Sequence, residues 1–156
     1  MITIGSSRVG QTLQNEDSAS LLENAVALGL RISRSPIEGQ GCFAAVRFHR
    51  HELMAEYVGE KITIAEAERR RGEPGPKSIC ALDLEWSIDG RRGGNGTEYI
   101  NHSCNPSCYL VVLRDRIFVY ARRNIAPGDE ITADYQYELE LEGRKCECRS
   151  SVCVDT

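Results

Sequence analysis

The chain of 156 residues lacks the features that mark several large classes of protein. It has no run approaching the ~20 apolar residues of a membrane span. Residues 1–7 lack the basic and apolar stretches of a secretory signal. Basic residues are not in excess, because 19 Lys and Arg stand against 23 Asp and Glu. The sequence therefore predicts an intracellular protein, cytoplasmic or nuclear, that contacts no membrane and binds no nucleic acid directly.

The residues that are present fit one globular domain. Hydrophobic residues make up 41% of the chain and charged residues 27%, which is ordinary for a soluble domain with a buried core. The formal net charge of −4 suits a basic peptide as partner.

Four of the seven cysteines form a pattern typical of a metal site. Cys104 follows Asn101-His102-Ser103, and three more cysteines end the chain as Cys146-x-Cys148-x4-Cys153. Four thiolates predict one structural zinc ion without an open coordination position. The alternative is two disulfides, which the lack of an export signal and the short Cys146–Cys148 spacing disfavour. The other three cysteines have apolar neighbours in the sequence, so we expect them to be reduced thiols in the core. They are Cys42, Cys80 and Cys108.

Several short segments alternate apolar and polar residues, which is typical of strands. Many short strands and few helices predict a mainly β protein with small sheets. The expected strands are 30–33, 53–58, 82–88, 109–113, 116–121 and 131–134.

Two helices are expected. A first helix would begin at Asp17 or Ser18 and end at Gly29. The second spans residues 64–71 and is followed by Gly72. Its Arg69-Arg70-Arg71 run suggests nucleic acid, but a solvated helix face paired with Glu66 and Glu68 is the better interpretation.

Five motifs in order carry a family resemblance. In chain order they are Gly39-Gln40-Gly41-Cys42-Phe43-Ala44, Glu56-Tyr57-Val58-Gly59-Glu60, Asn101-His102-Ser103-Cys104, Asp129-Glu130-Ile131-Thr132-Ala133-Asp134-Tyr135 and the C-terminal cysteines. Together they resemble the SET-domain protein lysine methyltransferases that carry a zinc-binding post-SET segment. The resemblance covers about residues 28–153. A Rossmann arrangement is excluded separately, because no long helix follows the glycines at 39 and 41.

The resemblance implies a fold and a division of the chain. The fold would be mainly β, a SET-domain (β-clip) fold of several small sheets with a knot-like C-terminal core and short helices. Residues 1–27 would be a lead-in, either flexible or a short helix. Residues 28–137 would form the SET domain, and residues 138–156 the post-SET zinc-binding segment.

The implied activity is S-adenosylmethionine-dependent methyl transfer to a lysine amine in a protein or peptide substrate, with histone tails among the candidates. The alternative is a catalytically weak SET module that binds a peptide or partner. A plain zinc ribbon is disfavoured because the chain lacks a C-x2-C knuckle pair. The resemblance makes Tyr135 and Tyr57 catalytic, and it assigns the zinc to Cys104, Cys146, Cys148 and Cys153. Its implied cofactor-binding residues are Gly39, Gln40, Gly41, Cys42, Phe43, Asn101, His102, Tyr135 and Glu147.

The proposed role of Tyr135 follows from the chemistry of lysine. A lysine amine with a pKa of about 10.4 is protonated at neutral pH, and its deprotonation costs roughly 4 kcal/mol. Burial beside a cationic sulfonium lowers that pKa, and a tyrosine hydroxyl can align the amine for attack. A tyrosine that serves only packing, and an Asn-His pair that only satisfies backbone groups, are the alternatives.

Several positions depart from the family pattern. Glu98-Tyr99 stands where Arg-Phe is frequent, and Ser107 stands where Asn is common. Ile79 is nearest to an expected tyrosine, and Ala133 replaces a Phe or Tyr. The small Ala133 side chain predicts room for more than one methyl group, unless Tyr109, Leu110 or Trp86 fills the gap.

Overall fold

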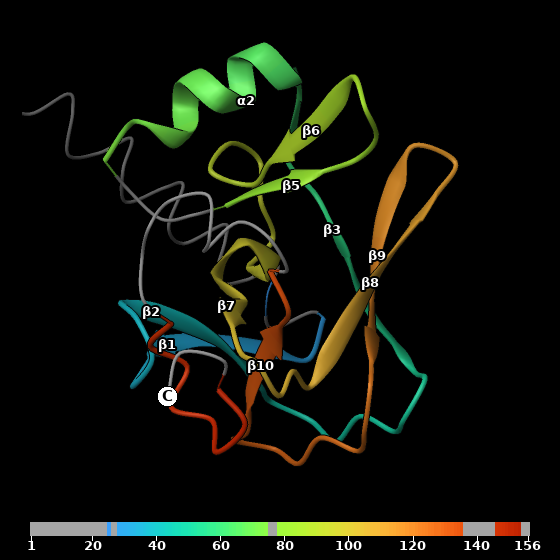
Figure 1. Cartoon of the computed structure of the whole chain (residues 1–156). Helices are drawn as coiled ribbons and strands as arrows, with labels where there is room; N and C mark the ends of the chain where they lie inside the picture. Colours follow the sequence, from blue (N-terminus) through green and yellow to red (C-terminus); the bar gives the residue numbers. More distant parts are fainter. Residues whose placement is uncertain (1–24, 26–27, 75–77, 136–145, 154–156) are drawn as a thin grey trace, which may run out of the picture.

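The computed structural model describes residue 25 and residues 28–74, 78–135 and 146–153. Strands dominate these residues and form three small sheets, with α2 as the α-helix (Figure 1). The predicted mainly β fold is confirmed. The expected helix 17–29 lies almost wholly outside the described residues. In the part that is described, no helix is both long and apolar enough to span a membrane.

The first sheet joins segments from the two ends of the chain. Its order is β1 (Leu30–Arg34), β2 (Gln40–Ala44), β10 (Glu130–Ala133) and β7 (Asn101–His102). The first three strands are antiparallel neighbours, whereas β10 and β7 run parallel. The Asn-His segment therefore lies beside the strand that leads to Tyr135.

The second sheet is a hairpin packed on a third strand. Its order is β3 (Leu53–Tyr57), β9 (Arg116–Ala121) and β8 (Cys108–Leu113). Arg114 and Asp115 join β8 to β9 with φ angles of 49° and 60°, the left-handed geometry that a two-residue hairpin turn requires. Figure 1 shows the tip of this hairpin standing away from the other sheets.

The third sheet carries the helix. Its order is β4 (Glu60–Thr63), β6 (Trp86–Asp89) and β5 (Ile79–Ala81). Helix α2 (Ile64–Arg71) follows β4 directly and has the predicted bounds. Thr63 caps it by accepting a hydrogen bond from the Glu66 amide, which satisfies one of the free N–H groups of the first turn.

Two expectations for this sheet were wrong. The strand predicted at residues 82–88 begins only at Trp86, because the Asp83 carboxylate accepts the N–H groups of Glu85 and Trp86 and forms a turn. Arg70 does not belong to a solvated helix face. Its side chain is 8% exposed and pairs with Glu60, Glu66 and Asp89.

The main core lies between the sheets. Strand periodicity places Leu30, Cys42, Ile117 and Ile131 inside it, each at most 1% exposed. Cys42 and Cys108 are core thiols as predicted. Cys80 is only partly buried: it packs against the main core and also lines a pocket.

Candidate active site

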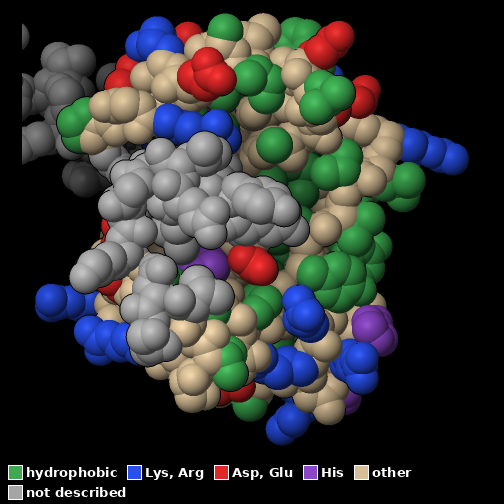
Figure 2. Space-filling view, in the orientation of Figure 1, with side chains coloured by type: hydrophobic (Ala, Val, Ile, Leu, Met, Phe, Trp, Pro, Cys, Tyr) green, Lys and Arg blue, Asp and Glu red, His purple; other side chains and the backbone are tan. Residues whose placement is uncertain are grey.

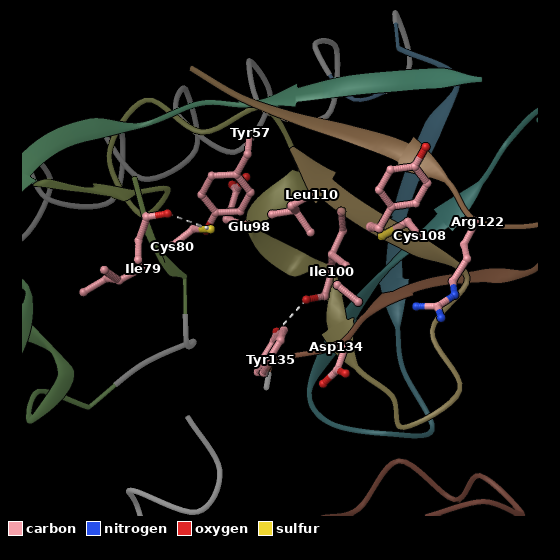
Figure 3. Close-up of a pocket in the computed structure, with 13 residues that line it drawn as sticks. Tyr57, Ile79, Cys80, Glu98, Ile100, Cys108, Leu110, Arg122, Asp134 and Tyr135 are labelled. Carbon is pink, nitrogen blue, oxygen red and sulfur yellow. Dashed lines mark hydrogen bonds between the residues drawn. The ribbon is translucent and has the colours of Figure 1, made fainter. Parts of the chain in front are cut away.

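A pocket of about 460 Å³ lies where the three sheets meet (Figure 3). Tyr57, at the end of β3, and Tyr135, which follows β10, both line it although 78 positions separate them in the sequence. Its other lining residues are Ile79, Cys80, Ala81, Glu98, Ile100, Cys108, Tyr109, Leu110, Arg122, Ala133 and Asp134. The fold therefore brings the two predicted catalytic tyrosines into one cavity.

Both tyrosine hydroxyls donate their proton to backbone carbonyl groups. The Tyr57 hydroxyl donates to the Ser78 carbonyl and the Tyr135 hydroxyl to the Ile100 carbonyl, each at 2.5 Å. Burial raises the pKa of Tyr57 well above its ordinary value, so this phenol stays neutral. With the protons engaged in this way, the lone pairs of the oxygen atoms are the groups that can receive hydrogen bonds from a ligand in the pocket.

His102 positions Tyr135. Its Nδ1 atom accepts the backbone N–H of Tyr135 at 3.1 Å, and the two rings lie 5.5 Å apart. Ala133, two residues before Tyr135, pairs with His102 in the parallel ladder, and this pairing brings Tyr135 and His102 to the same end of the sheet. The other ring nitrogen of His102, Nε2, is 3.4 Å from Cys104 Sγ.

Asn101 joins the predicted cofactor segments to each other. Its side-chain amide donates to the carbonyl groups of Glu38 and Gln40 at 3.2 and 3.1 Å. It also donates to the Glu130 carboxylate at 2.9 Å, and Ser35 Oγ donates to the same carboxylate at 2.7 Å. The amide therefore satisfies backbone groups, as in the alternative interpretation, and at the same time holds the turn 38–40 beside Asn101.

The glycines of that turn meet two different needs. Gly39 has φ +47°, which favours glycine. A Cβ atom on Gly41 would approach Glu130 Oε1 to 2.3 Å, so a larger residue would displace the carboxylate that Asn101 and Ser35 hold. Cys42 and Phe43 lie within the sheet, where both pair with β1 and β10. Gly39 and Gln40, at the exposed end of β2, are the part of this segment that a ligand reaches most readily.

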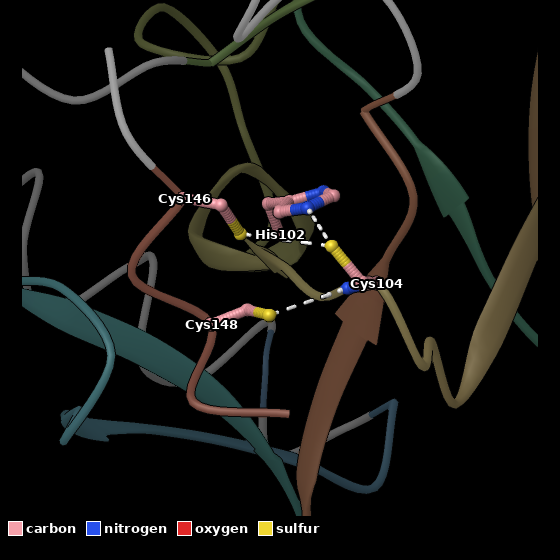
Figure 4. Close-up of side chains that lie close together, drawn as sticks. All are labelled: His102, Cys104, Cys146 and Cys148. Carbon is pink, nitrogen blue, oxygen red and sulfur yellow. Dashed lines mark hydrogen bonds between the residues drawn. The ribbon is translucent and has the colours of Figure 1, made fainter. Parts of the chain in front are cut away.

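The four predicted zinc ligands lie together, although 49 positions separate the first from the last. Figure 4 shows three of them, Cys104, Cys146 and Cys148, with His102 beside them. Cys104 Sγ is 3.7 Å from Cys146 Sγ and 4.0 Å from Cys153 Sγ. The ligand atoms of His102, Cys104, Cys146 and Cys148 lie within 4.8 Å of one another. A tetrahedral ZnS₄ site with bonds of about 2.3 Å has sulfur atoms about 3.8 Å apart, so the arrangement fits zinc.

The thiols of the cluster differ in pKa, and burial raises the pKa of Cys146. Burial opposes ionisation of Cys148, yet hydrogen bonds from the backbone N–H groups of Cys104 and Ser150 lower its pKa to about 7. All seven cysteines are free, which disagrees with the disulfide alternative. The ring of His102 lies among the thiols, so it is a competing candidate ligand. The side chain of Glu147, between Cys146 and Cys148, is exposed.

Glu98, Cys80 and Arg122 are among the pocket residues that were not predicted as site residues. Glu98 is 6% exposed, its carboxylate accepts the Gly96 N–H at 2.8 Å, and burial raises its pKa. Its departure from the usual arginine was a signal that could have identified it. For Arg122 the sequence contains no comparable signal, because its neighbours in the pocket are distant in the chain.

Comparisons with known proteins agree with this geometry. The family model described as "SET domain" matches residues 39–136. The chain is 35% identical over 133 residues to histone-lysine N-methyltransferase set-2 of Caenorhabditis elegans, a match that covers 80% of this chain and 9% of that protein. It is 35% identical over 132 residues to histone-lysine N-methyltransferase trr of Drosophila melanogaster, a match that covers 78% of this chain and 5% of that protein.

A human relative has the same relation to the chain. Histone-lysine N-methyltransferase SETD1B of Homo sapiens is 34% identical over 136 residues, which is 81% of this chain and 7% of that protein. The chain thus spans less than a tenth of the length of each of these three relatives.

Proposed function

This chain belongs to the SET domain family, and on that premise we propose that it is a protein-lysine N-methyltransferase that uses S-adenosylmethionine. One observation carries the proposal. The hydroxyl groups of Tyr57 and Tyr135 line the same pocket, and Asn101 and His102 tie the walls of that pocket to the turn that contains Gly39.

Each pocket residue has a role in the proposed reaction. Tyr135 accepts a hydrogen bond from the substrate amine and aligns its lone pair. Tyr57 lines the channel opposite and, as a buried neutral phenol, excludes water without adding charge. The apolar walls formed by Ile100 and Leu110 disfavour a charged ammonium, so the lysine loses its proton to solvent before the transfer.

The cofactor supplies a methyl group on a positively charged sulfonium. Transfer of this methyl group to the neutral amine would leave a neutral thioether and give a methylated ammonium, which releases its proton to solvent. Gly39, Gln40, Asn101 and His102 are the residues we assign to hold the cofactor, together with the neighbouring Gly41, Cys42, Phe43, Tyr135 and Glu147.

The zinc would serve structure. Four thiolates from Cys104 and the three C-terminal cysteines leave no position for water. The metal would fasten the last residues to the segment that follows His102. We accordingly propose residues 28–137 as the SET domain and 138–156 as the post-SET segment, with 1–27 as a lead-in.

The substrate is proposed as a lysine-containing protein. The three relatives carry the name histone-lysine N-methyltransferase, which makes a histone the first candidate. A catalytically weak module that only binds a peptide is the second function. Activity separates the two.

The test is transfer of a labelled methyl group to a panel of proteins and lysine peptides. Tyr135→Phe removes only the hydroxyl, so we expect kcat to fall by at least ~100-fold while cofactor binding changes less than ~3-fold, as for an interaction made chiefly in the transition state. Tyr120→Phe is the matched control, because Tyr120 stacks on Tyr109 and does not line the pocket. Equal turnover in wild type and Tyr135→Phe would remove Tyr135 from the mechanism.

A further inference from the structure

Several exposed basic side chains lie on neighbouring segments, and one of them lines the pocket. They come from the segment between β2 and β3 and from the residue that follows β9. Figure 2 shows Lys, Arg and His side chains collected on the lower right of this face, below the hairpin of β8 and β9. All five residues of this basic rim are exposed: Arg47, His49, Arg50, His51 and Arg122.

Backbone contacts hold the two segments together. Phe48 and Ile125 form an antiparallel bridge, and the His51 N–H donates to the Ala121 carbonyl at 2.8 Å. The Arg50 N–H donates to Asn124 Oδ1 at 2.9 Å. The backbone positions from which these basic side chains extend are therefore fixed relative to one another.

The rim reaches the pocket itself. Arg122 lines the pocket, and Figure 3 shows its guanidinium on the same side as the Asp134 carboxylate. His51 Nδ1 lies 3.4 Å from the hydroxyl of Tyr109, which also lines the pocket. A substrate whose lysine occupies the channel must pass close to these groups.

The rim arginines differ from those of α2 in their pairing. Arg69 and Arg70 form ion pairs with glutamates. In contrast, across the residues that the structure describes, the guanidinium groups of Arg47, Arg50 and Arg122 have neither an ion pair nor a hydrogen bond. Their charges are available to a partner, and together they create a positive field beside a protein whose net charge is −4.

We propose that this basic rim binds acidic side chains of the protein substrate that flank the target lysine; the inference rests on the proposed methyltransferase function. Because an extended peptide advances about 3.3 Å per residue, Arg122 reaches a carboxylate within about three residues of the lysine. The net charge suits a peptide that is basic overall, whereas the rim acts only on the positions next to the lysine, where it favours acidic residues over basic ones. An acidic peptide fits better than nucleic acid, since the protein has no overall basic face.

The experiment compares three peptides that differ only beside a single lysine. The flanking positions hold Glu in the first peptide, Gln in the second and Arg in the third. With wild type, we expect kcat/KM for the Glu peptide to exceed that for the Gln peptide by roughly 5-fold, as for a few exposed ion pairs. Arg122→Glu should reverse this order. Arg114→Glu, an exposed residue at the hairpin tip, is the control that should preserve it.

Peptide binding measured by fluorescence anisotropy separates the two hypotheses. If no peptide is methylated but the Glu peptide still binds more tightly through Arg122, the methyltransferase function fails and the rim stands. Equal kcat/KM for all three peptides would overturn the proposal that the basic rim binds acidic side chains beside the lysine. A mixed-sequence DNA duplex that binds through Arg50 and Arg122, without any charge preference among peptides, also overturns it by assigning the surface to nucleic acid. Arg50→Glu repeats the measurement with a second variant, and thermal melts verify that each variant folds.

Discussion

His102 is the residue at which Tyr135 and the cysteine cluster meet. Nδ1 accepts the N–H of Tyr135, and Nε2 lies next to Cys104 Sγ. A single side chain therefore links Tyr135 to the cysteines that are the proposed zinc ligands.

His102→Ala is expected to lower both kcat and cofactor affinity, each by ~10-fold or more, because Tyr135 loses the acceptor of its backbone N–H. Steady-state kinetics and calorimetric titration of cofactor measure the two effects. This result would contrast with Tyr135→Phe, which should spare binding. A variant with normal kcat and weakened binding only would show that His102 does not position Tyr135.

Ala133 controls the volume beside Tyr135. It is 3% exposed and lines the pocket together with Tyr109 and Leu110, whereas Trp86 does not. In the family, Tyr at this position favours one methyl group and Phe allows more. We therefore predict that wild type proceeds beyond monomethyl-lysine, and that Ala133→Tyr shifts the product toward monomethyl-lysine while keeping the first transfer.

Mass spectrometry of the peptide product after long incubation with excess cofactor measures that shift. Ala81→Tyr adds the same side chain elsewhere on the pocket wall and should leave the product distribution unchanged. If wild type stops at one methyl group, then Tyr109 or Leu110 fills the space and Ala133 does not set the number.

At the scale of elements, an ion-pair network fastens α2 to β4 and β6. Arg70 bonds Glu60 and Asp89 at 2.6 and 2.9 Å, and Arg91 bonds Asp89 at 2.9 Å. Asp89 is 1% exposed, yet its pKa is lowered to about 2, because bonds from the two arginines outweigh the burial that opposes its charge.

This network predicts a pH dependence of stability. Because the folded-state pKa of Asp89 lies below its unfolded value, its contribution is complete above about pH 4 and is lost as the pH falls toward 2. The loss should be roughly 2 kcal/mol. Asp89→Asn should remove it, and should destabilise the protein by ~3 kcal/mol at pH 7, because Arg70 and Arg91 both lose a buried carboxylate partner.

Urea unfolding at several pH values measures the difference between wild type and Asp89→Asn. The difference matters because the pKa of Glu66 is also lowered to about 2 by bonds from Arg69 and Arg70. Glu68→Gln, which changes an exposed carboxylate of the same helix, is the control. An unchanged gap between wild type and Asp89→Asn from pH 6 to pH 2.5 would contradict the assignment.

At the scale of the whole molecule, the cysteine cluster joins the C-terminal segment to the sheet that carries Tyr135. Cys104 follows β7, and Cys148 is buried beside it at 7% exposure. Structural zinc sites bind with about 10–16 kcal/mol, which is comparable to the stability of a domain.

Removal of one ligand should therefore act far from the cluster. Cys148→Ser is expected to reduce zinc from one equivalent per chain to a small fraction, to expose residues after 145 to protease and to abolish transfer. Elemental analysis and limited proteolysis measure these effects, with Cys80→Ser as the control for zinc content because Cys80 lies outside the cluster. Wild-type protein without zinc would refute the metal site.

The sequence by itself determined the features that depend on local chemistry. The bounds of α2 follow from Thr63 and Gly72, and alternating side chains predicted strands such as β1 and β9. The order of five motifs identified the family, since each motif is contiguous in the chain. The thiolate set could be predicted for the same reason, because spacing and residue type define it.

Only the tertiary structure decided which distant residues share a pocket. Contacts between Tyr57 and the walls near Tyr135, the position of Glu98, and the nearness of Arg122 to Tyr109 arise from pairing between strands that are remote in sequence. The burial of Arg70 likewise depends on Glu60 and Asp89 arriving from other strands. Local pattern reports which side of an element is apolar, but the identity of the neighbour is set by packing of the whole chain.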